Sequence, residues 1–180
     1  MRHRLRGFGW EVVCGWAILL ACLCSACAIF PAWAEPPRGL DAPLETVTGE
    51  KLRLADYRGK VLVINFWATW CPPCLNEIPT LIQFQKQYQE QGLAIIGVNF
   101  MDRADRGKLS GFVTQWGINY PIILGDPKKI QGLGQFLGGV VGLPTTKFLD
   151  RKGNVVRSQT GELEPERLRR WIEPLLSAPP

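Results

Sequence analysis

The sequence predicts an α/β fold built on a mixed sheet, and three observations support this prediction. Two almost uninterrupted apolar runs, residues 61–67 and 93–100, have the composition of buried central strands. Residues 72–91 lie between them and carry apolar side chains at helical spacing, which is typical of a crossover between parallel strands. Nearer the C-terminus, Arg151-Lys152-Gly153 joins two strand-like segments and indicates an antiparallel pair at one edge.

The expected elements follow one another in the order β-β-β-α-β-α-β-α-β-β-α. Gly49-Glu50 turns a small N-terminal hairpin, and only Asn65 interrupts the first central strand. Gly92 stops the first helix, and Pro79 inside that helix is expected to kink it. The strands are expected at residues 46–54 (the hairpin), 61–67, 93–100, 121–124, 145–150 and 154–160, and the helices at residues 72–91, 108–116, 126–137 and 165–176.

Residues 1–34 have the organisation of an export signal. Three arginines occur among the first six residues, and an uncharged stretch then extends over residues 12–34. This stretch ends in Ala32-Trp33-Ala34, a small-x-small pattern typical of a cleavage site. We therefore expect residues 1–34 to be removed as a signal peptide.

Two other interpretations of this segment stay open. Residues 12–34 are long enough to anchor the chain in a membrane, and Leu19-Leu20-Ala21-Cys22 resembles a lipobox. In each case the remainder of the chain is exported. A Pro-rich linker over residues 35–43 and one folded domain over residues 44–177 are expected to follow.

The usage of cysteine, histidine and charge excludes several functions. Four of the six cysteines lie in the leader, so the mature chain keeps Cys71 and Cys74. The only histidine, His3, also lies there, which excludes a Cys-His protease and a His-ligated metal site. Two cysteines are too few for a four-cysteine zinc site. The formal net charge of +5 includes no long basic run, so no nucleic-acid partner is expected.

The segment Trp70-Cys71-Pro72-Pro73-Cys74 places two thiols between a buried strand and the start of a helix. A helix start stabilises a thiolate and makes it a nucleophile near neutral pH. Cys71 is therefore the expected nucleophile and Cys74 the resolving thiol, and the disulfide between them is the only redox group expected. The alternative is a static structural disulfide, although such bridges usually join more distant segments. Leu75 replaces the histidine that a c-type haem site requires.

The dipeptide Pro72-Pro73 removes two backbone N–H donors from the helix start. This loss weakens the stabilisation of a Cys71 thiolate. We expect a reduction potential nearer to that of thioredoxin, about −270 mV, than to the value of about −120 mV for a strong oxidant. Pro72 is also explained as a favourable first-turn residue.

Two residues outside the cysteine motif are further candidates. A cis bond between Leu143 and Pro144 would place the backbone of Leu143 beside the sulfurs, ready to pair with an incoming peptide. An ordinary trans proline that begins a strand is the alternative. Glu77 lies three residues after Cys74 and could exchange the proton that the resolving step requires. It could also be an exposed residue favoured by the helix dipole.

The chain resembles the exported TlpA/ResA/DsbE family of thioredoxin-like proteins over about residues 38–177. The resemblance is carried by Phe66-Trp67-Ala68-Thr69-Trp70-Cys71-Pro72-Pro73-Cys74, Pro79 and Gly142-Leu143-Pro144-Thr145-Thr146. It implies a three-layer α/β/α sandwich with a mixed sheet and an extra N-terminal β-hairpin. It also implies a cis bond before Pro144, an active-site role for Glu77, and thiol–disulfide exchange in the periplasm or on the outer face of the cytoplasmic membrane.

The resemblance further implies a protein-disulfide reductase whose substrates contact Trp70, Pro72, Leu143 and Pro144. Oxidised protein thiols, among them those of apocytochrome c during cytochrome c maturation, would be the substrates. A membrane donor of the DsbD/CcdA type would supply the electrons.

Two residues depart from related proteins. Asn65 stands where thioredoxin has a buried aspartate, which transfers the acid–base role to Glu77. Thr145 stands where the CcmG-like maturation proteins usually have an acidic residue, so membership of that subgroup is not expected.

Other functions remain compatible with the motif. The same chemistry can run as a disulfide oxidase or isomerase. The apolar surface around Trp70 could instead serve a non-enzymatic binding module for unfolded chains or partner proteins. A dithiol can also carry a soft ion such as copper(I). A peroxidase is disfavoured, because the Thr-x-x-Cys arrangement of peroxiredoxins is missing.

Overall fold

The computed structural model describes residues 39–179 and contains the predicted succession of strands and helices. The strands are β1 (Leu44–Glu45), β2 (Lys51–Leu52), β3 (Val61–Trp67), β4 (Leu93–Asn99), β5 (Ile122–Ile123), β6 (Thr145–Leu149) and β7 (Val155–Thr160). The α-helices are α2 (Pro72–Tyr88), α3 (Arg106–Trp116), α4 (Pro127–Phe136) and α5 (Pro165–Ser177), and short 3₁₀ helices are η2 (Gly39–Asp41), η3 (Leu54–Tyr57) and η4 (Gln89–Gln91). The predicted leader, residues 1–34, and the first part of the predicted linker lie outside the described residues.

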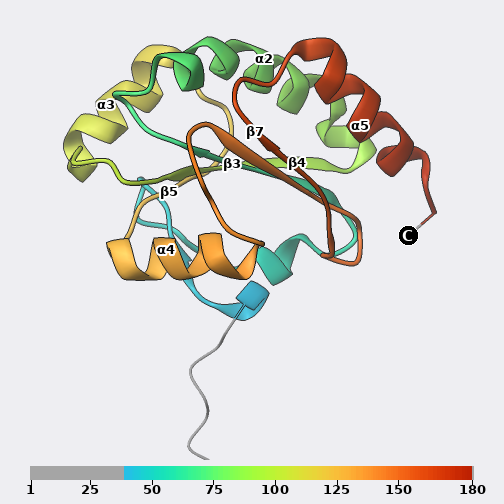
Figure 1. The fold of residues 1–180 in the computed structure, drawn as a ribbon, viewed down its shortest axis with the longest axis horizontal. Coiled ribbons are helices and arrows are strands. Elements are labelled where there is room, and N and C mark those ends of the chain that lie inside the picture. Colours follow the sequence, from blue (N-terminus) through green and yellow to red (C-terminus); the bar gives the residue numbers. More distant parts are fainter. Residues whose placement is uncertain (1–38, 180) are drawn as a thin grey trace, which may run out of the picture. The chain divides into compact units, whose positions relative to one another are not determined.

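Strands β3 and β4 form the centre of a five-stranded mixed sheet with the order β5-β4-β3-β6-β7 (Figure 1). Strands β3, β4 and β5 are parallel, whereas β6 and β7 run antiparallel to their neighbours. Every residue of β3 and β4 is buried, which explains why both are almost entirely apolar. The polar exception in β3 is Asn65, whose partners are described below.

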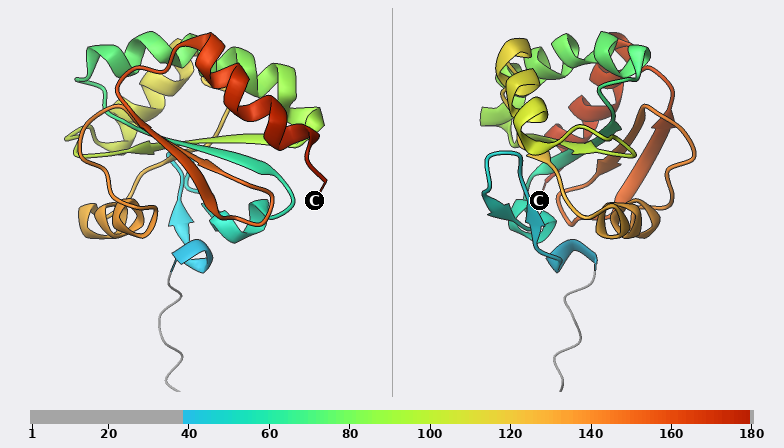
Figure 2. Two further views of the ribbon diagram at one scale, coloured as in Figure 1. Left: turned by 45° about the vertical axis from the view of Figure 1, so that its right-hand side comes forward. Right: turned by 90° about the vertical axis from the view of Figure 1, so that its left-hand side faces the viewer.

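Helices α2, α3 and α5 cover one face of the sheet, and α4 covers the other together with the N-terminal hairpin (Figures 1 and 2). Each face has its own apolar cluster. One cluster includes Trp67 and Phe84, and the other includes Phe66 and Leu133. Neighbouring residues of β3 therefore enter opposite clusters, as the pleat of a strand requires. The three-layer arrangement with a mixed sheet is confirmed.

The N-terminal hairpin is present but shorter than predicted. The sequence predicts it within residues 46–54, whereas the pairing is limited to two residue pairs that begin with Leu44 opposite Leu52. Thr46 still donates its N–H to the carbonyl of Glu50 at 2.8 Å, and it also forms an antiparallel bridge with Ile123 of β5. The hairpin therefore also pairs with the edge of the main sheet, a contact between distant segments that a local pattern cannot reveal.

Local signals set the helix boundaries. The helical stretch that begins with α2 ends where predicted, at Gly92, which has a left-handed φ of 94°. Pro79 lies inside α2, and the predicted bend there stays a prediction. Helix α3 begins two residues earlier than predicted, because the side chain of Asp105 accepts the N–H of Lys108 and caps it. Among residues 39–179, no helix has both the length and the apolar composition needed to cross a membrane.

Three loops meet at one end of the sheet. Trp67 at the end of β3 lies opposite Asn99 at the end of β4, so the loops that follow these parallel strands leave the same edge. Thr145, the first residue of β6, pairs with Phe66, which brings the loop before β6 to this edge as well. Helix α2 also begins here, so the fold gathers the predicted site residues at one end.

Candidate active site

The two cysteines of the predicted motif form a disulfide at the start of α2. Their sulfur atoms are 2.04 Å apart and their Cα atoms 5.3 Å apart. Cys71 is the N-cap of α2, and Pro72 and Pro73 occupy the first two helical positions. Both cysteines are buried in this oxidised form, with 3% exposure for Cys71 and 0% for Cys74. The two cysteines therefore differ little in exposure.

The start of α2 offers few free N–H groups to a thiolate on Cys71. Pro72 and Pro73 have no N–H to donate. The N–H groups of Cys74 and Leu75 both donate to the carbonyl of Cys71, at 3.0 and 3.2 Å. This helix start therefore stabilises an anion less than one whose first N–H groups are free.

Glu77 is buried, with only 2% exposure, so it is not the exposed helix residue that the sequence also allowed. Its Oε1 accepts the side-chain amide of Asn65 at 2.6 Å, and its Oε2 accepts the N–H of Leu163 at 3.0 Å. Burial raises the pKa of Glu77 to about 7, although these two hydrogen bonds oppose the rise. A carboxyl group with this pKa can accept or donate a proton near neutral pH.

Asn65 connects Glu77 to the segment that follows Pro144. The same amide nitrogen of Asn65 donates to Oγ1 of Thr146 at 3.1 Å. The three side chains come from β3, α2 and β6, and all are buried. The residue that departs from thioredoxin in sequence therefore holds the carboxyl group of Glu77 in place.

The peptide bond between Leu143 and Pro144 is cis, as the family resemblance implied. Pro144 is buried and Leu143 is half-buried. The carbonyl of Pro144 accepts the N–H of Gly161 at 2.8 Å, which ties this loop to the end of β7. Val141, in the same loop before β6, is 91% exposed. The loop thus presents apolar surface at the end of the sheet that holds the disulfide.

The structure adds Met101 and Asp102, which sequence reasoning missed. Trp70 is 61% exposed, and its indole N–H donates to the carbonyl of Met101 at 3.2 Å. A carboxylate oxygen of Asp102 accepts the N–H of Thr69 at 2.6 Å. The order of the elements could have indicated both residues. The carboxyl ends of neighbouring parallel strands lie at the same edge of the sheet, so the loop after β4 lies beside the residues before Cys71.

Asp102 fixes its own loop as well. It also accepts the side-chain amide of Asn99 at 2.9 Å and the N–H of Ala104 at 3.0 Å. Burial disfavours the charge of Asp102, but hydrogen bonds from Thr69, Asn99 and Ala104 outweigh it and lower the pKa of this carboxyl. An ionised Asp102 therefore clamps the segment before Cys71 to the loop after β4.

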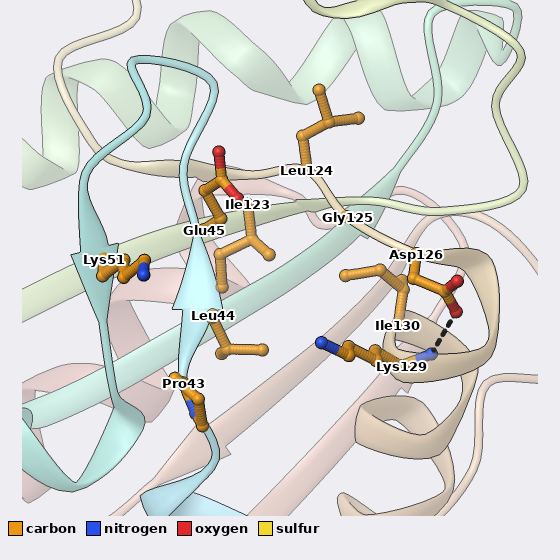
Figure 3. Close-up of a pocket in the computed structure, with 10 residues that line it drawn as sticks. All are labelled: Pro43, Leu44, Glu45, Lys51, Ile123, Leu124, Gly125, Asp126, Lys129 and Ile130. Carbon is orange, nitrogen blue, oxygen red and sulfur yellow. Dashed lines mark hydrogen bonds between the residues drawn. The ribbon is translucent and has the colours of Figure 1, made fainter.

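Two hollows lie along α4. One has a volume of 260 Å³ and lies between the hairpin and α4, with Lys51 and Lys129 on opposite walls (Figure 3). The other, of 270 Å³, is lined in part by Met101 and Asp102. Within the part of the chain that the structure describes, no group of three or more His, Cys, Asp or Glu side chains is placed to hold a metal ion.

The fold and the site define the class of a thioredoxin-like protein with a Cys-x-x-Cys disulfide. The model of the AhpC/TSA family matches residues 38–158. Over 138 residues the chain is 36% identical to the thiol-disulfide oxidoreductase ResA of Bacillus thuringiensis (strain Al Hakam), which covers 75% of this chain and 76% of that protein. The chain belongs to the AhpC/TSA family, and it is a thiol–disulfide oxidoreductase.

Solved structures agree with this assignment. A thiol:disulfide interchange protein of the thioredoxin family from Chlorobium tepidum TLS has a TM-score of 0.65 and 31% identity, covering 81% of this chain and 100% of that one. A secreted thiol-disulfide isomerase from Corynebacterium glutamicum has a TM-score of 0.67 and 26% identity, covering 77% of this chain and 84% of that one. The thioredoxin-like fold is thereby confirmed.

Proposed function

We propose that this oxidoreductase acts as an exported reductase of protein disulfides, with Cys71 and Cys74 as its redox couple. The observation that carries the proposal is Glu77, a buried carboxyl group three residues after Cys74 whose pKa is raised to about 7. Thiol exchange at neutral pH needs a group that can take a proton from the resolving thiol. Glu77 has the burial and the pKa for this task.

The proposed reaction has two steps. The thiolate of Cys71 attacks a substrate disulfide, forms a mixed disulfide and releases one substrate thiolate. The thiol of Cys74 then gives its proton to Glu77 and attacks the sulfur of Cys71, which releases the second substrate thiolate. Two electrons pass to the substrate, and the Cys71–Cys74 disulfide of this structure is the product.

The direction of the reaction is supported by the helix start. A strong oxidant stabilises its reduced, thiolate form. Here the first N–H groups of α2 are missing or already bonded to the carbonyl of Cys71, so the thiolate receives less stabilisation. The dithiol therefore gives up its electrons readily, which is the property of a reductase.

The proposed location and partners are supported by the leader-like residues 1–34 and by the family. Export to the periplasm or the outer face of the cytoplasmic membrane is supported by the secreted relative from Corynebacterium glutamicum. We propose oxidised protein thiols as substrates, including those of apocytochrome c, and a membrane donor of the DsbD/CcdA type as the source of electrons. Trp70, Pro72 and the backbone of Leu143 would receive the substrate beside the buried Pro144.

Trapping of the mixed disulfide tests this proposal. A Cys74→Ala variant keeps the nucleophile but cannot resolve the adduct, so covalent complexes should accumulate at Cys71. Mass spectrometry of complexes recovered from cells would identify the trapped proteins. The matched Cys71→Ala variant should trap far less. The absence of adducts from cells that express the Cys74→Ala variant would contradict the proposal.

A disulfide isomerase is the second candidate, because the Corynebacterium glutamicum relative carries that name. An isomerase reactivates a protein with scrambled disulfides without net consumption of electrons. A reductase consumes one dithiol for each disulfide that it opens. Counting the dithiol consumed for each substrate molecule reactivated separates the two functions.

A further inference from the structure

Exposed apolar side chains gather at the end of the sheet that holds the disulfide. Among residues 39–179, the large apolar side chains that are exposed are Trp70, Met101, Phe136, Val141, Val155 and Val156. Three of them, Trp70, Met101 and Val141, belong to the three loops that meet at this end, and Met101 is 78% exposed. Single exposed apolar residues are ordinary, but a group of them beside a reactive centre indicates a surface that another molecule covers.

Met101 is held in an unfavourable backbone conformation. Its φ is 54°, in the left-handed region that residues with a Cβ atom rarely adopt. The hydrogen bond from Trp70 to its carbonyl and the three hydrogen bonds to the neighbouring Asp102 fix this conformation. Strain that is maintained in this way is typical of ligand-binding loops. The loop keeps the side chain of Met101 exposed next to the residue that precedes Cys71.

A small pocket opens beside this loop. Its volume is 270 Å³, below the range of about 300–1,000 Å³ for sites that bind whole small molecules, so it suits a single side chain. Apolar residues form most of its wall: Phe100, Met101, Leu124, Pro127 and Ile130. Two of its polar residues, Asn99 and Asp102, are hydrogen-bonded to each other. We call this cavity the Met101 pocket.

The neighbouring hollow in Figure 3 differs in its lining. It shares Leu124, Gly125 and Ile130 with the Met101 pocket. Its remaining wall, however, carries the charged side chains of Glu45, Lys51, Asp126 and Lys129, and it includes no residue of the loop after β4 (Figure 3). The Met101 pocket is therefore the more apolar of the two, and it is the one lined by the loop after β4.

We propose that the Met101 pocket binds an apolar side chain that flanks the reacting cysteine of the substrate polypeptide. The inference rests on the proposed function and names a specificity site for it. A substrate joined to Cys71 must pass close to Trp70, which is hydrogen-bonded to Met101, so residues near its cysteine reach this pocket. Apolar walls and a volume suited to one side chain select leucine or phenylalanine over serine or aspartate.

The variants Met101→Gly, Met101→Leu and Val156→Ser test the proposal. Glycine adopts a φ of 54° without strain, so Met101→Gly removes the side chain while the loop keeps its conformation. Its thermal midpoint should be no lower than that of the native protein. Met101→Leu keeps an apolar side chain. Val156→Ser is the matched control, because it removes an exposed apolar side chain from β7, outside the three loops at the disulfide end of the sheet.

The measurement is the second-order rate constant of the reduced protein with two disulfide peptides, whose cysteine is flanked by leucine or by serine. We expect the native protein to prefer the leucine peptide, and we expect Met101→Gly to lower this preference about tenfold. The preference should persist in Met101→Leu and Val156→Ser. Hydroxyethyl disulfide, which has no flanking side chain, is the reference substrate for each protein.

Equal preference in the native protein and Met101→Gly, or no preference in the native protein, would overturn the subsite while leaving the proposed reductase intact. Loss of the preference in Met101→Leu would also overturn it, because an apolar contact should survive that change. A native protein that reacts with neither peptide nor hydroxyethyl disulfide would instead overturn the proposed function itself.

Discussion

The buried carboxyl group of Glu77 receives its hydrogen bonds from other groups of the protein. The amide of Asn65 and the N–H of Leu163 each donate to one of its oxygens, and burial still raises its pKa to about 7. The sequence identified Glu77 through a family resemblance, but its burial and its partners depend on residues 12 and 86 positions away. No local pattern could have supplied those contacts.

The raised pKa of Glu77 predicts a loss of stability with rising pH. The folded-state value of about 7 exceeds the ordinary value of 4.5, so the unfolded chain releases this proton first as the pH rises. The contribution of protonated Glu77 to the free energy of unfolding is complete below pH 4.5. It is lost as the pH rises to about 7, and the free energy of unfolding falls by roughly 3 kcal/mol in total. Urea unfolding of the oxidised protein across this range should show the slope, and Glu77→Gln should abolish it. The exposed Glu166→Gln is the control; an unchanged slope in Glu77→Gln would refute the assignment.

The same substitution should slow the resolving step. Without a carboxylate at position 77, the thiol of Cys74 loses its proton only to solvent, so release of the second substrate thiol should fall about 100-fold. Formation of the mixed disulfide at Cys71 should change little. Rapid-mixing kinetics resolve the two steps, and the inflection of the native profile near pH 7 should disappear. A native inflection that persists in Glu77→Gln would assign the proton transfer to another group.

Among the elements, those predicted well have local signals. Strands β3 and β4 are almost entirely apolar because both of their faces are covered, and α4 begins at an aspartate cap, Asp126. The hairpin was predicted less well because Thr46 pairs with Ile123, far along the chain. The clamp formed by Asp102 was missed for the same reason: its partner Thr69 lies 33 residues earlier.

Arg151, in the turn between β6 and β7, joins elements at the end of the sheet away from the disulfide. Its guanidinium donates to the carbonyls of Gly59 at 2.6 Å, Leu176 at 2.8 Å and Gln91 at 3.3 Å. The N–H of Gly59 in turn donates to the carbonyl of Arg151 at 2.8 Å. The turns before β3 and β4 and the end of α5 are thus tied to one side chain.

Replacement of Arg151 by methionine should destabilise the protein by about 2 kcal/mol, because three carbonyls lose a charged donor. The redox potential should not change, since this turn lies far from the site. Urea unfolding measures the first effect, and titration with a dithiol buffer checks the second. The exposed Arg170→Met on α5 serves as the comparison. Equal stability of the two variants would show that the bonds of Arg151 contribute little.

For the whole molecule, the order of elements and the mixed sheet followed from composition and spacing, whereas the three-layer sandwich was implied by the family resemblance. The cysteine motif is the basis of the proposed redox centre, because two thiols between a buried strand and a helix start are typical of a redox site. The export of the chain stays a prediction, since it depends on residues 1–34, outside the described residues.

We predict that the mature protein begins at Glu35, which N-terminal sequencing of the protein from its native cell would establish. A mature chain that still carries the uncharged stretch 12–34 would favour the membrane anchor.

In the proposed reductase, the Cys71–Cys74 disulfide is a reversible couple set toward reduction of other proteins. Equilibration of the purified protein with mixtures of reduced and oxidised dithiothreitol, followed by alkylation and mass measurement, tests it most directly. A reductase couple should show a single two-electron transition at about −270 mV. A disulfide that stays closed at every ratio, or a transition near about −120 mV, would contradict it.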